Sequence, residues 1–244
     1  MRLRKKTLLF CLLFFSISVF VLCGWIIFYC KKNVFYWDGE TYQNKKESSY
    51  LKTIKLKKSN YFKDYFDLDE DGSSEEIDLI KKRIFVKKDG KIIWQSDELW
   101  SIENLIIADS NNDGKIEINF SLWKTSSYGR DLPFWLKENT KEWGNHFFVY
   151  GWINGKVSPV WCSSTLDSPI KEFKIGDVNR DGKNELIVLE GDYADSKYKL
   201  AKYLAVWSWG DWGFFNDYRS KEGRFYNLSI LDLGKDKKIE VYEK

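Results

Sequence analysis

The pattern of apolar and polar positions divides the chain into one long apolar segment followed by many short alternating runs. Residues 7–29 form an uncharged stretch of 23 residues, and a helix of that length, at about 1.5 Å rise per residue, crosses a hydrocarbon core of about 30 Å. Later runs such as 77–80, 118–122, 186–189 and 241–242 have strand length and strand-forming residues. The pattern predicts one transmembrane helix followed by an all-β body.

The charges on either side of the apolar segment predict its orientation. Four basic residues lie within residues 2–6 and two follow at 31–32, and the more positive flank stays in the cytoplasm. A cleaved signal peptide is the alternative, but residues 25–28 are bulky where a cleavage site needs small residues. We therefore expect a cytoplasmic tail at 1–6, a signal-anchor helix at 7–29, a short tether at 30–33 and an extracytoplasmic domain at 34–244.

Composition supports a β-rich body and gives no support to nucleic-acid binding. Aromatic residues make up 18% of the 244 positions, and aromatic side chains favour strands over helix bundles. The 39 basic and 36 acidic residues are mixed along the chain, so the net charge of +3 implies no basic patch. Three of the four cysteines lie in or beside the apolar segment, which argues against a disulfide framework.

A nine-residue acidic pattern recurs in the β-rich part. Three copies, starting at residues 67, 109 and 177, share Asp at position 1, Asp or Asn at position 3, Asp at position 5, Gly at position 6 and Glu at position 9. Calcium takes about six to eight oxygen ligands, which alternate side chains of a tight loop and one backbone carbonyl can supply. The alternative for any single loop is a metal-free Asx-type turn.

The predicted calcium ligands form one set per loop, with the residue at position 7 contributing its backbone carbonyl. They are Asp67, Asp69, Asp71, Ser73 and Glu75; Asp109, Asn111, Asp113, Lys115 and Glu117; and Asp177, Asn179, Asp181, Lys183 and Glu185. A fourth copy at 232–240 has Gly234 at position 3 and Lys237 at position 6, so we expect it to bind no metal.

This motif, followed each time by a strand, resembles the FG-GAP/VCBS-type repeats, the integrin-α-like calcium loops of β-propellers. Spaced motifs between residues 61 and 243 carry the resemblance, and the chain lacks a clear Phe-Gly…Gly-Ala-Pro signature, which leaves the subfamily open. The resemblance implies a β-propeller with structural calcium.

The spacing of the loops suggests the number of blades. The loop starts are 42, 68 and 55 residues apart, close to the length of a propeller blade of about 40–50 residues if the second interval contains an insertion, which we place at 125–143. Too few residues follow the last loop to form a whole blade. Residues 34–42 and 51–57 are therefore expected to complete the last blade and to close the ring. Four blades is the expected number, and five irregular blades is the alternative.

Candidate catalytic residues are few. His146 is the only histidine and no nucleophile-elbow motif accompanies it, so we interpret it as structural. Cys162 is interpreted as a buried residue on a strand. A pair such as Glu190 and Asp192 would be needed for the alternative function, a membrane-tethered enzyme acting on cell-wall or other polysaccharide.

The favoured function is a membrane-anchored extracytoplasmic binding or interaction module with a glycan or protein partner. The aromatic run at 206–215 is expected to form a hairpin that packs between blades. Ligand contacts are expected from aromatic residues in loops, because binding residues tend to occupy loops on a rigid scaffold. These are Tyr128, Trp135, Trp143 and Trp212.

Overall fold

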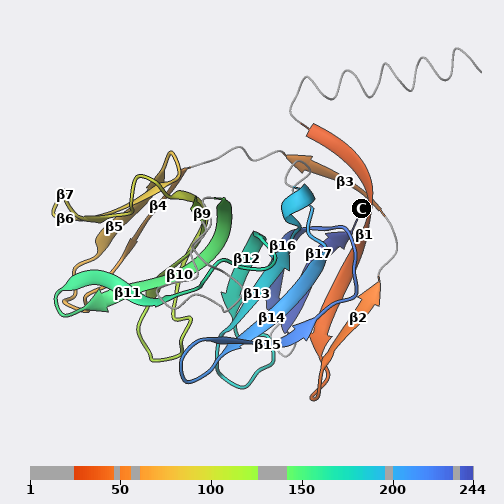
Figure 1. Ribbon diagram of the computed structural model, residues 1–244. Coiled ribbons are helices and arrows are strands. Elements are labelled where there is room, and N and C mark those ends of the chain that lie inside the picture. The colour runs from red at the N-terminus through yellow and green to blue at the C-terminus, as the bar shows by residue number, and fades with distance from the viewer. Residues whose placement is uncertain are drawn as a thin grey trace, which may run out of the picture.

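The structure, a computed structural model, describes residues 25–46, 50–55, 61–125, 142–195, 200–232 and 237–243. Apart from one short 3-10 helix, η1 (Tyr193–Asp195), the regular elements in these ranges are β-strands in antiparallel sheets (Figure 1). The all-β prediction is therefore confirmed for the described part of the chain.

Three sheets each contain four strands that are consecutive in sequence and in space. The first sheet consists of β4 (Tyr61–Phe66), β5 (Glu75–Ile80), β6 (Arg83–Lys88) and β7 (Lys91–Gln95). The second sheet consists of β8 (Ser101–Ala108), β9 (Glu117–Thr125), β10 (Trp143–Ile153) and β11 (Lys156–Cys162). The third sheet consists of β12 (Ile170–Gly176), β13 (Glu185–Glu190), β14 (Tyr203–Trp209) and β15 (Phe214–Arg219).

The fourth sheet contains strands from both ends of the chain. Its spatial order is β16 (Phe225–Asp232), β17 (Lys237–Glu243), β1 (Trp25–Trp37) and β2 (Tyr42–Lys46), while β3 (Tyr50–Lys55) pairs with the first half of β1. Phe35 of β1 lies opposite Ile239 of β17. In the first three sheets, a complete copy of the acidic pattern begins directly after the first strand, and in the fourth sheet the incomplete copy begins at Asp232, the last residue of β16.

Consecutive sheets are held together by three apolar clusters. The first and second sheets share one cluster, the second and third share another, and the third and fourth share the last. Because side chains alternate along a strand, the central strands serve two clusters at once. On β13, Leu186 and Val188 face the second sheet, whereas Ile187 and Leu189 face the fourth.

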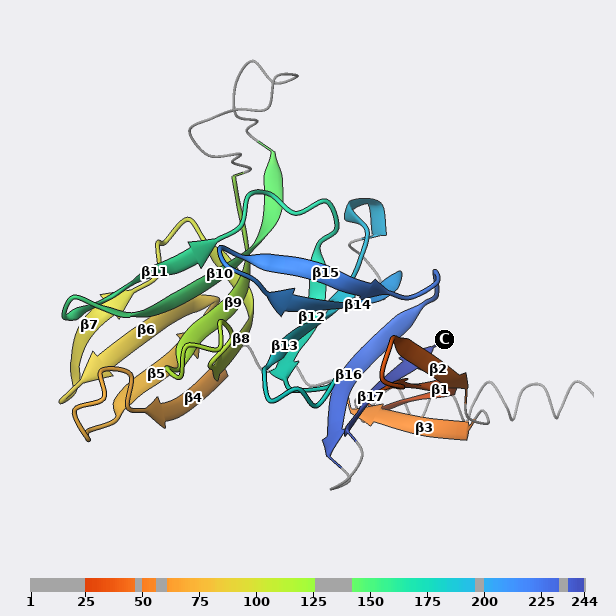
Figure 2. The same ribbon diagram turned by 90° about the horizontal axis from the view of Figure 1, so that it is seen from below.

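The sheets follow one another in sequence order, with the first and fourth at the two ends of the series in both views (Figures 1 and 2). No apolar cluster within the described ranges joins the first sheet to the fourth. Four sheets of propeller type are present, and closure of the four into a ring stays a prediction.

The N-terminal boundaries differ from those expected. Residues 25–29, expected at the end of the transmembrane helix, belong to β1, and so do residues 30–33, expected as a tether. Trp, Ile, Phe and Tyr favour strands, and an apolar run of such residues has no periodicity that separates helix from strand. The rest of the predicted helix lies outside the described residues. Among those described, no helix has the length and apolarity needed to span a membrane.

The aromatic hairpin lies where the sequence predicts it. It consists of β14 and β15, whose turn is closed by a hydrogen bond from the Gly210 backbone N–H to the Gly213 carbonyl. Trp161 of the second sheet contacts Trp209 and Phe214 of the hairpin, with ring centroids 6.3 and 5.5 Å apart. The hairpin therefore packs between two sheets, as expected.

Candidate metal centre

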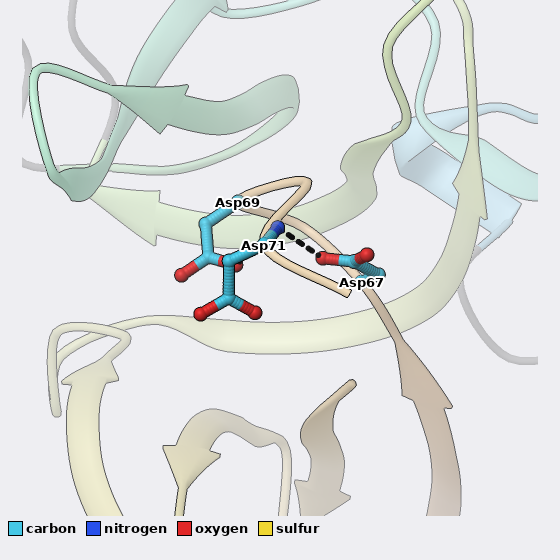
Figure 3. Close-up of side chains that lie close together, drawn as sticks. All are labelled: Asp67, Asp69 and Asp71. Atoms are coloured by element: carbon cyan, nitrogen blue, oxygen red, sulfur yellow. Dashed lines mark hydrogen bonds between the residues drawn. The ribbon is translucent and has the colours of Figure 1, made fainter. Parts of the chain in front are cut away.

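The three complete acidic loops occupy equivalent places in three consecutive sheets. The first loop (67–75) joins β4 to β5, the second loop (109–117) joins β8 to β9, and the third loop (177–185) joins β12 to β13. In the first loop, the side chains of Asp67, Asp69 and Asp71 converge, and the Asp71 backbone N–H donates to Asp67 Oδ1 over 3.1 Å (Figure 3).

The loops share one backbone conformation. The glycine at position 6 has a φ of 88°, 89° and 85° in the three loops, a left-handed conformation that glycine adopts without steric cost. The residue at position 4 is also left-handed, with φ of 60° at Glu70, 60° at Asn112 and 70° at Arg180. The motif predicts the turn at glycine but does not predict the left-handed conformation at position 4. A positive φ is uncommon for residues other than glycine.

The glutamate at position 9 is the most buried member of each loop. Glu75, Glu117 and Glu185 are 0%, 2% and 2% exposed. Each accepts a hydrogen bond from the backbone N–H at position 2, over 2.9, 2.8 and 2.8 Å in the three loops. This repeated contact fixes one carboxylate oxygen on the loop backbone and orients the side chain toward the other acids.

The aspartates at positions 1 and 5 are held by backbone donors as well. The N–H of Gly72 and that of Gly114 each donate over 2.9 Å to the aspartate at position 1 of the same loop. In each loop the N–H of position 7 donates to the Asp at position 5, over 2.9, 2.9 and 2.8 Å. The ligand role predicted for the carbonyls of Ser73, Lys115 and Lys183 stays a prediction.

The first and second loops gather three acidic groups closely enough for one metal ion, whereas the acids of the third loop do not converge this closely. Oxygen atoms of Asp67, Asp69 and Asp71 lie within 4.8 Å of one another, and so do those of Asp109, Asp113 and Glu117. Calcium binds oxygens at about 2.3–2.6 Å, so ligands on opposite sides of the ion are about 5 Å apart. Asp109 Oδ1 is buried and has no protein hydrogen-bond partner. The residues of the second loop therefore fit a hard divalent cation.

Burial makes the charge on two of the glutamates costly. Loss of solvent raises the pKa of Glu117 to about 7, and the charges of Asp113 and Asp109 add to the rise. The pKa of Glu185 is likewise raised to about 7, mainly by burial and further by Asp181 and Asp177. In the first loop, a hydrogen bond from Lys88 holds the pKa of Asp71 below its ordinary value. A bound cation would favour the ionised form of these groups.

The second and third loops are joined to each other by hydrogen bonds. The backbone N–H of Asn184 donates to Asn112 Oδ1 over 2.7 Å, and Asn184 Nδ2 donates to the Asp109 carbonyl over 2.8 Å. Asn112 Nδ2 donates back to the Asn184 carbonyl over 3.2 Å. The sequence offered no signal for this connection, because the two asparagines are 72 residues apart.

The fourth copy of the pattern retains only its edges in the described chain. Asp232 ends β16 and Lys237 begins β17. Lys237 Nζ lies 3.6 Å from Asp177 Oδ2 of the third loop, and Glu240 forms an ion pair with Lys32 of β1. Its position-9 glutamate is thus paired with a lysine.

Of the four predicted ligand-binding aromatics, Trp143 and Trp212 lie in the described chain, and only Trp212 borders the cavity. Tyr128 and Trp135 lie outside the described residues, and Trp143 begins β10 with 56% of its surface exposed. Trp212, in the turn between β14 and β15, is 73% exposed and borders a cavity of about 460 Å³ between the second and third sheets. The sequence singled out Trp212 but not the rest of the cavity wall, which includes Trp161, Trp207 and Phe214.

Three charged side chains line the same cavity: Asp167, Glu190 and Arg219. Arg219 Nη2 lies 2.5 Å from Glu190 Oε2, and burial raises the pKa of the Glu190 carboxyl while Arg219 lowers it. Asp192, the other half of the carboxylate pair expected for an enzyme, instead lies 2.5 Å from Lys202 Nζ. Each carboxylate therefore has its own basic partner, an arrangement that suits binding better than general acid–base chemistry.

His146 is buried between the Ser163 carbonyl and the Thr165 hydroxyl, whose Oγ1 lies 3.4 Å from His146 Nε2. The His146 ring is 1% exposed, its Nδ1 lies 3.2 Å from the Ser163 carbonyl, and burial lowers its pKa to about 4. This agrees with a structural role. Cys162 is exposed at the end of β11, so the prediction of a buried cysteine is wrong. Partial desolvation raises its thiol pKa to about 11, which leaves little thiolate at neutral pH.

Comparison of the chain with protein-family models, curated proteins and solved structures finds no match in any of the three. The resemblance of the acidic loops to FG-GAP/VCBS-type repeats therefore rests on the loop residues alone.

Proposed function

We propose that the chain is a membrane-anchored, extracytoplasmic binding module built as a small β-propeller, with calcium in its acidic loops as a structural ion. The observation that carries the proposal is the recurrence of one loop geometry at one place in three consecutive sheets, each closed by a buried glutamate. An ordinary Asx-type turn needs no buried acid, and a buried carboxylate is costly unless a cation or hydrogen bonds compensate it.

Calcium would be held by the side-chain oxygens of Asp109, Asp113 and Glu117 in the second loop, and by the corresponding side chains of the third. Its contribution is charge compensation and cross-linking of the loop, not chemistry. Extracellular modules bind calcium with dissociation constants of about 10⁻⁴–10⁻³ M, which matches the concentration outside cells and not that of the cytosol. The metal and the outward topology predicted from the basic flank thus support one another.

The first experiment measures the melting temperature of the full-length protein in detergent, with calcium and with excess chelator. A ligand that binds only the folded state raises stability by mass action, so calcium should raise the melting temperature saturably. The Asp109→Ala/Asp177→Ala double variant should lose this rise. The control removes two exposed acids outside the loops, Glu98→Ala/Glu222→Ala, and should keep it. No calcium-dependent shift in the parent protein would refute the metal proposal.

The binding site we propose is the cavity beside Trp212, and a glycan is the ligand class. Indole faces, hydroxyl side chains from the 163–168 segment and the Glu190–Arg219 pair lie around one opening, and ligand sites combine apolar aromatic walls with a few polar groups that fix orientation. A glycan array should identify binders, and Trp212→Ala should weaken them while Trp143→Ala, which removes a similarly exposed indole elsewhere, should not. A blank array, with a protein recovered by cross-linking in the native membrane, would refute the glycan and favour a protein partner.

A further inference from the structure

We infer that the first acidic loop carries its own cation, the Lys88 ammonium group, and that only the second and third loops take up calcium. The inference refines the proposed function, on which the calcium sites of the second and third loops rest. It does not need those two sites to exist, because the contacts that carry it lie within the first sheet.

The Lys88 ammonium contacts three carboxylates of the first loop. Its Nζ lies 2.5 Å from Asp69 Oδ2, 2.7 Å from Asp71 Oδ2 and 2.9 Å from Glu75 Oε1. These are positions 3, 5 and 9, which the motif assigns to the metal. Nζ donates hydrogen bonds to Asp69 and Asp71, and it forms an ion pair with Glu75 Oε1, a buried oxygen that has no hydrogen-bond partner. Its hydrogen bonds, that to Asp69 foremost, hold the pKa of Lys88 above its ordinary value, and the group stays charged.

Strand register explains why only the first loop receives this lysine. In an antiparallel pair, residues directly opposite each other point to the same face of the sheet. Glu76 lies opposite Lys87, which places Lys88 opposite Glu75. Ile118 lies opposite Tyr150, which places Gly151 opposite Glu117, and Glu185 lies directly opposite Ser208. The residue facing the position-9 glutamate is therefore lysine, glycine and serine in the three sheets.

Neither of the other two residues can replace the lysine. Gly151 has no side chain, and a Cβ added there would lie 3.6 Å from Glu117 Cγ. The Ser208 hydroxyl donates to Asp217 on the neighbouring strand. Among the ion pairs of the described residues, none reaches Asp109, Asp113 or Glu117, and the ion pair at the third loop joins Lys237 to Asp177 over 3.6 Å. Lys115, Arg180 and Lys183 belong to these two loops, and Lys115 pairs with Glu70 of the first loop. Among the described residues, no ion pair bridges two acids of the second loop or of the third, as Lys88 does in the first.

Lys88 and calcium would compete for the same space. The ammonium nitrogen lies 2.5–2.9 Å from its three oxygens, nearly the distance at which calcium binds oxygen, about 2.3–2.6 Å. Calcium could enter the first loop only after Lys88 left it. The three loops thus share one motif, with Asp69, Asn111 or Asn179 at position 3, and a residue on the third strand of the sheet decides whether the cation comes from the chain or from solution.

The test counts calcium ions bound per chain by equilibrium dialysis of the full-length protein in detergent. The parent protein should bind two. Lys88→Ser, which gives the first sheet the residue found in the third, should bind three, and Ser208→Lys should bind one. Lys87→Ser removes a neighbouring lysine that pairs with Glu76 and Asp78 outside the loop ligands, and it should still bind two.

A second pair of variants tests the inference without altering Lys88, in case that substitution prevents folding. Asp67→Ala should leave two calcium ions bound, whereas Asp109→Ala should leave one. Three ions in the parent protein, with one lost in Asp67→Ala, would overturn the inference. No calcium in the parent but one ion in Lys88→Ser would refute the proposed calcium sites and still support the role of Lys88. No calcium in either protein would refute both.

Discussion

Replacing Glu117 by glutamine tests whether the second loop is built around a charge that needs a metal. Glutamine keeps the carbonyl oxygen that accepts the Ser110 backbone N–H but removes the negative charge. The pKa of Glu117 is about 7 in the folded protein, against an ordinary value of 4.5. Folding therefore favours the protonated form, so the cost of the charge is nil below about pH 4.5 and complete above pH 7.

The magnitude follows from the size of this rise in pKa. One pKa unit corresponds to about 1.4 kcal/mol, so a rise from 4.5 to about 7 costs at most about 3 kcal/mol, and we expect about 1–3 kcal/mol. In chelator at pH 8, Glu117→Gln should be more stable than the parent protein by that amount. At pH 4 the advantage should nearly vanish, because the parent glutamate is then mostly protonated in the folded and unfolded states alike.

Calcium should offset the stability advantage of the Glu117→Gln variant, because it binds the charged loop of the parent protein and stabilises it. With a dissociation constant of about 10⁻⁴–10⁻³ M, 10 mM calcium stabilises one loop by about 1.4–2.7 kcal/mol. The variant should lose this gain, so its advantage at pH 8 should shrink toward zero in calcium. Urea unfolding in both buffers measures the two differences.

The control is Glu172→Gln, which neutralises a glutamate outside the loops whose pKa is also raised by burial and which accepts the Leu228 backbone N–H. Its effect should be the same in calcium and in chelator. If Glu117→Gln instead lowered stability in chelator at pH 8, the Glu117 charge would not destabilise the metal-free loop, and the prediction would be refuted.

Two further predictions concern the scaffold. His146 is the only histidine, and its pKa of about 4 lies below the ordinary 6.5, so its contribution to stability is present above pH 6.5 and is lost as the pH falls toward 4. Between pH 7 and pH 5 the parent protein should lose about 2 kcal/mol of stability relative to His146→Gln, which urea unfolding of the two proteins would measure. An imidazole signal that titrates near pH 6.5 by NMR would contradict this prediction. Phe120→Ala should lower the free energy of unfolding by about 3–5 kcal/mol, because Phe120 is fully buried between the first and second sheets. The control Phe215→Ala removes an exposed ring and should lower the free energy of unfolding far less. Equal losses in the two variants would contradict this packing.

Local patterns in the sequence predicted the repeated features of the fold. The acidic loops could be found because their residues are adjacent, and the strands after them because short β-branched and aromatic runs follow each loop. The first residues of β1 could not be assigned, because the apolar run at 25–29 suits a strand as well as a membrane helix. The exposure of Cys162 depends on the neighbours of β11, which no local pattern encodes.

The features that distinguish the loops from one another depend on strand register. Lys88 is 13 residues beyond Glu75 and belongs to no motif, and its role becomes visible only when β5 and β6 are paired. Counting motifs gives three equivalent calcium sites, whereas pairing the strands separates one loop from the other two. Register is set by turns and by burial of alternate residues, and the motif alone does not contain that information.

The second and third loops lie at one end of the same sheets that form the cavity. Glu185 begins β13 in the third loop, and Glu190 ends it in the cavity, so one strand of six residues, about 17 Å long, joins the two sites. Asn112 and Asn184 join the second loop to the third, which ties the two sheets together at the loop end. Calcium should therefore restrict the movement of one cavity wall against the other.

Because coupling between two ligands is reciprocal, a glycan that binds the cavity should lower the calcium concentration needed for half-saturation, and calcium should raise the affinity for the glycan by the same factor. Asn184→Ala should reduce both effects equally, and unequal changes would show that the two sites are not linked through the loops.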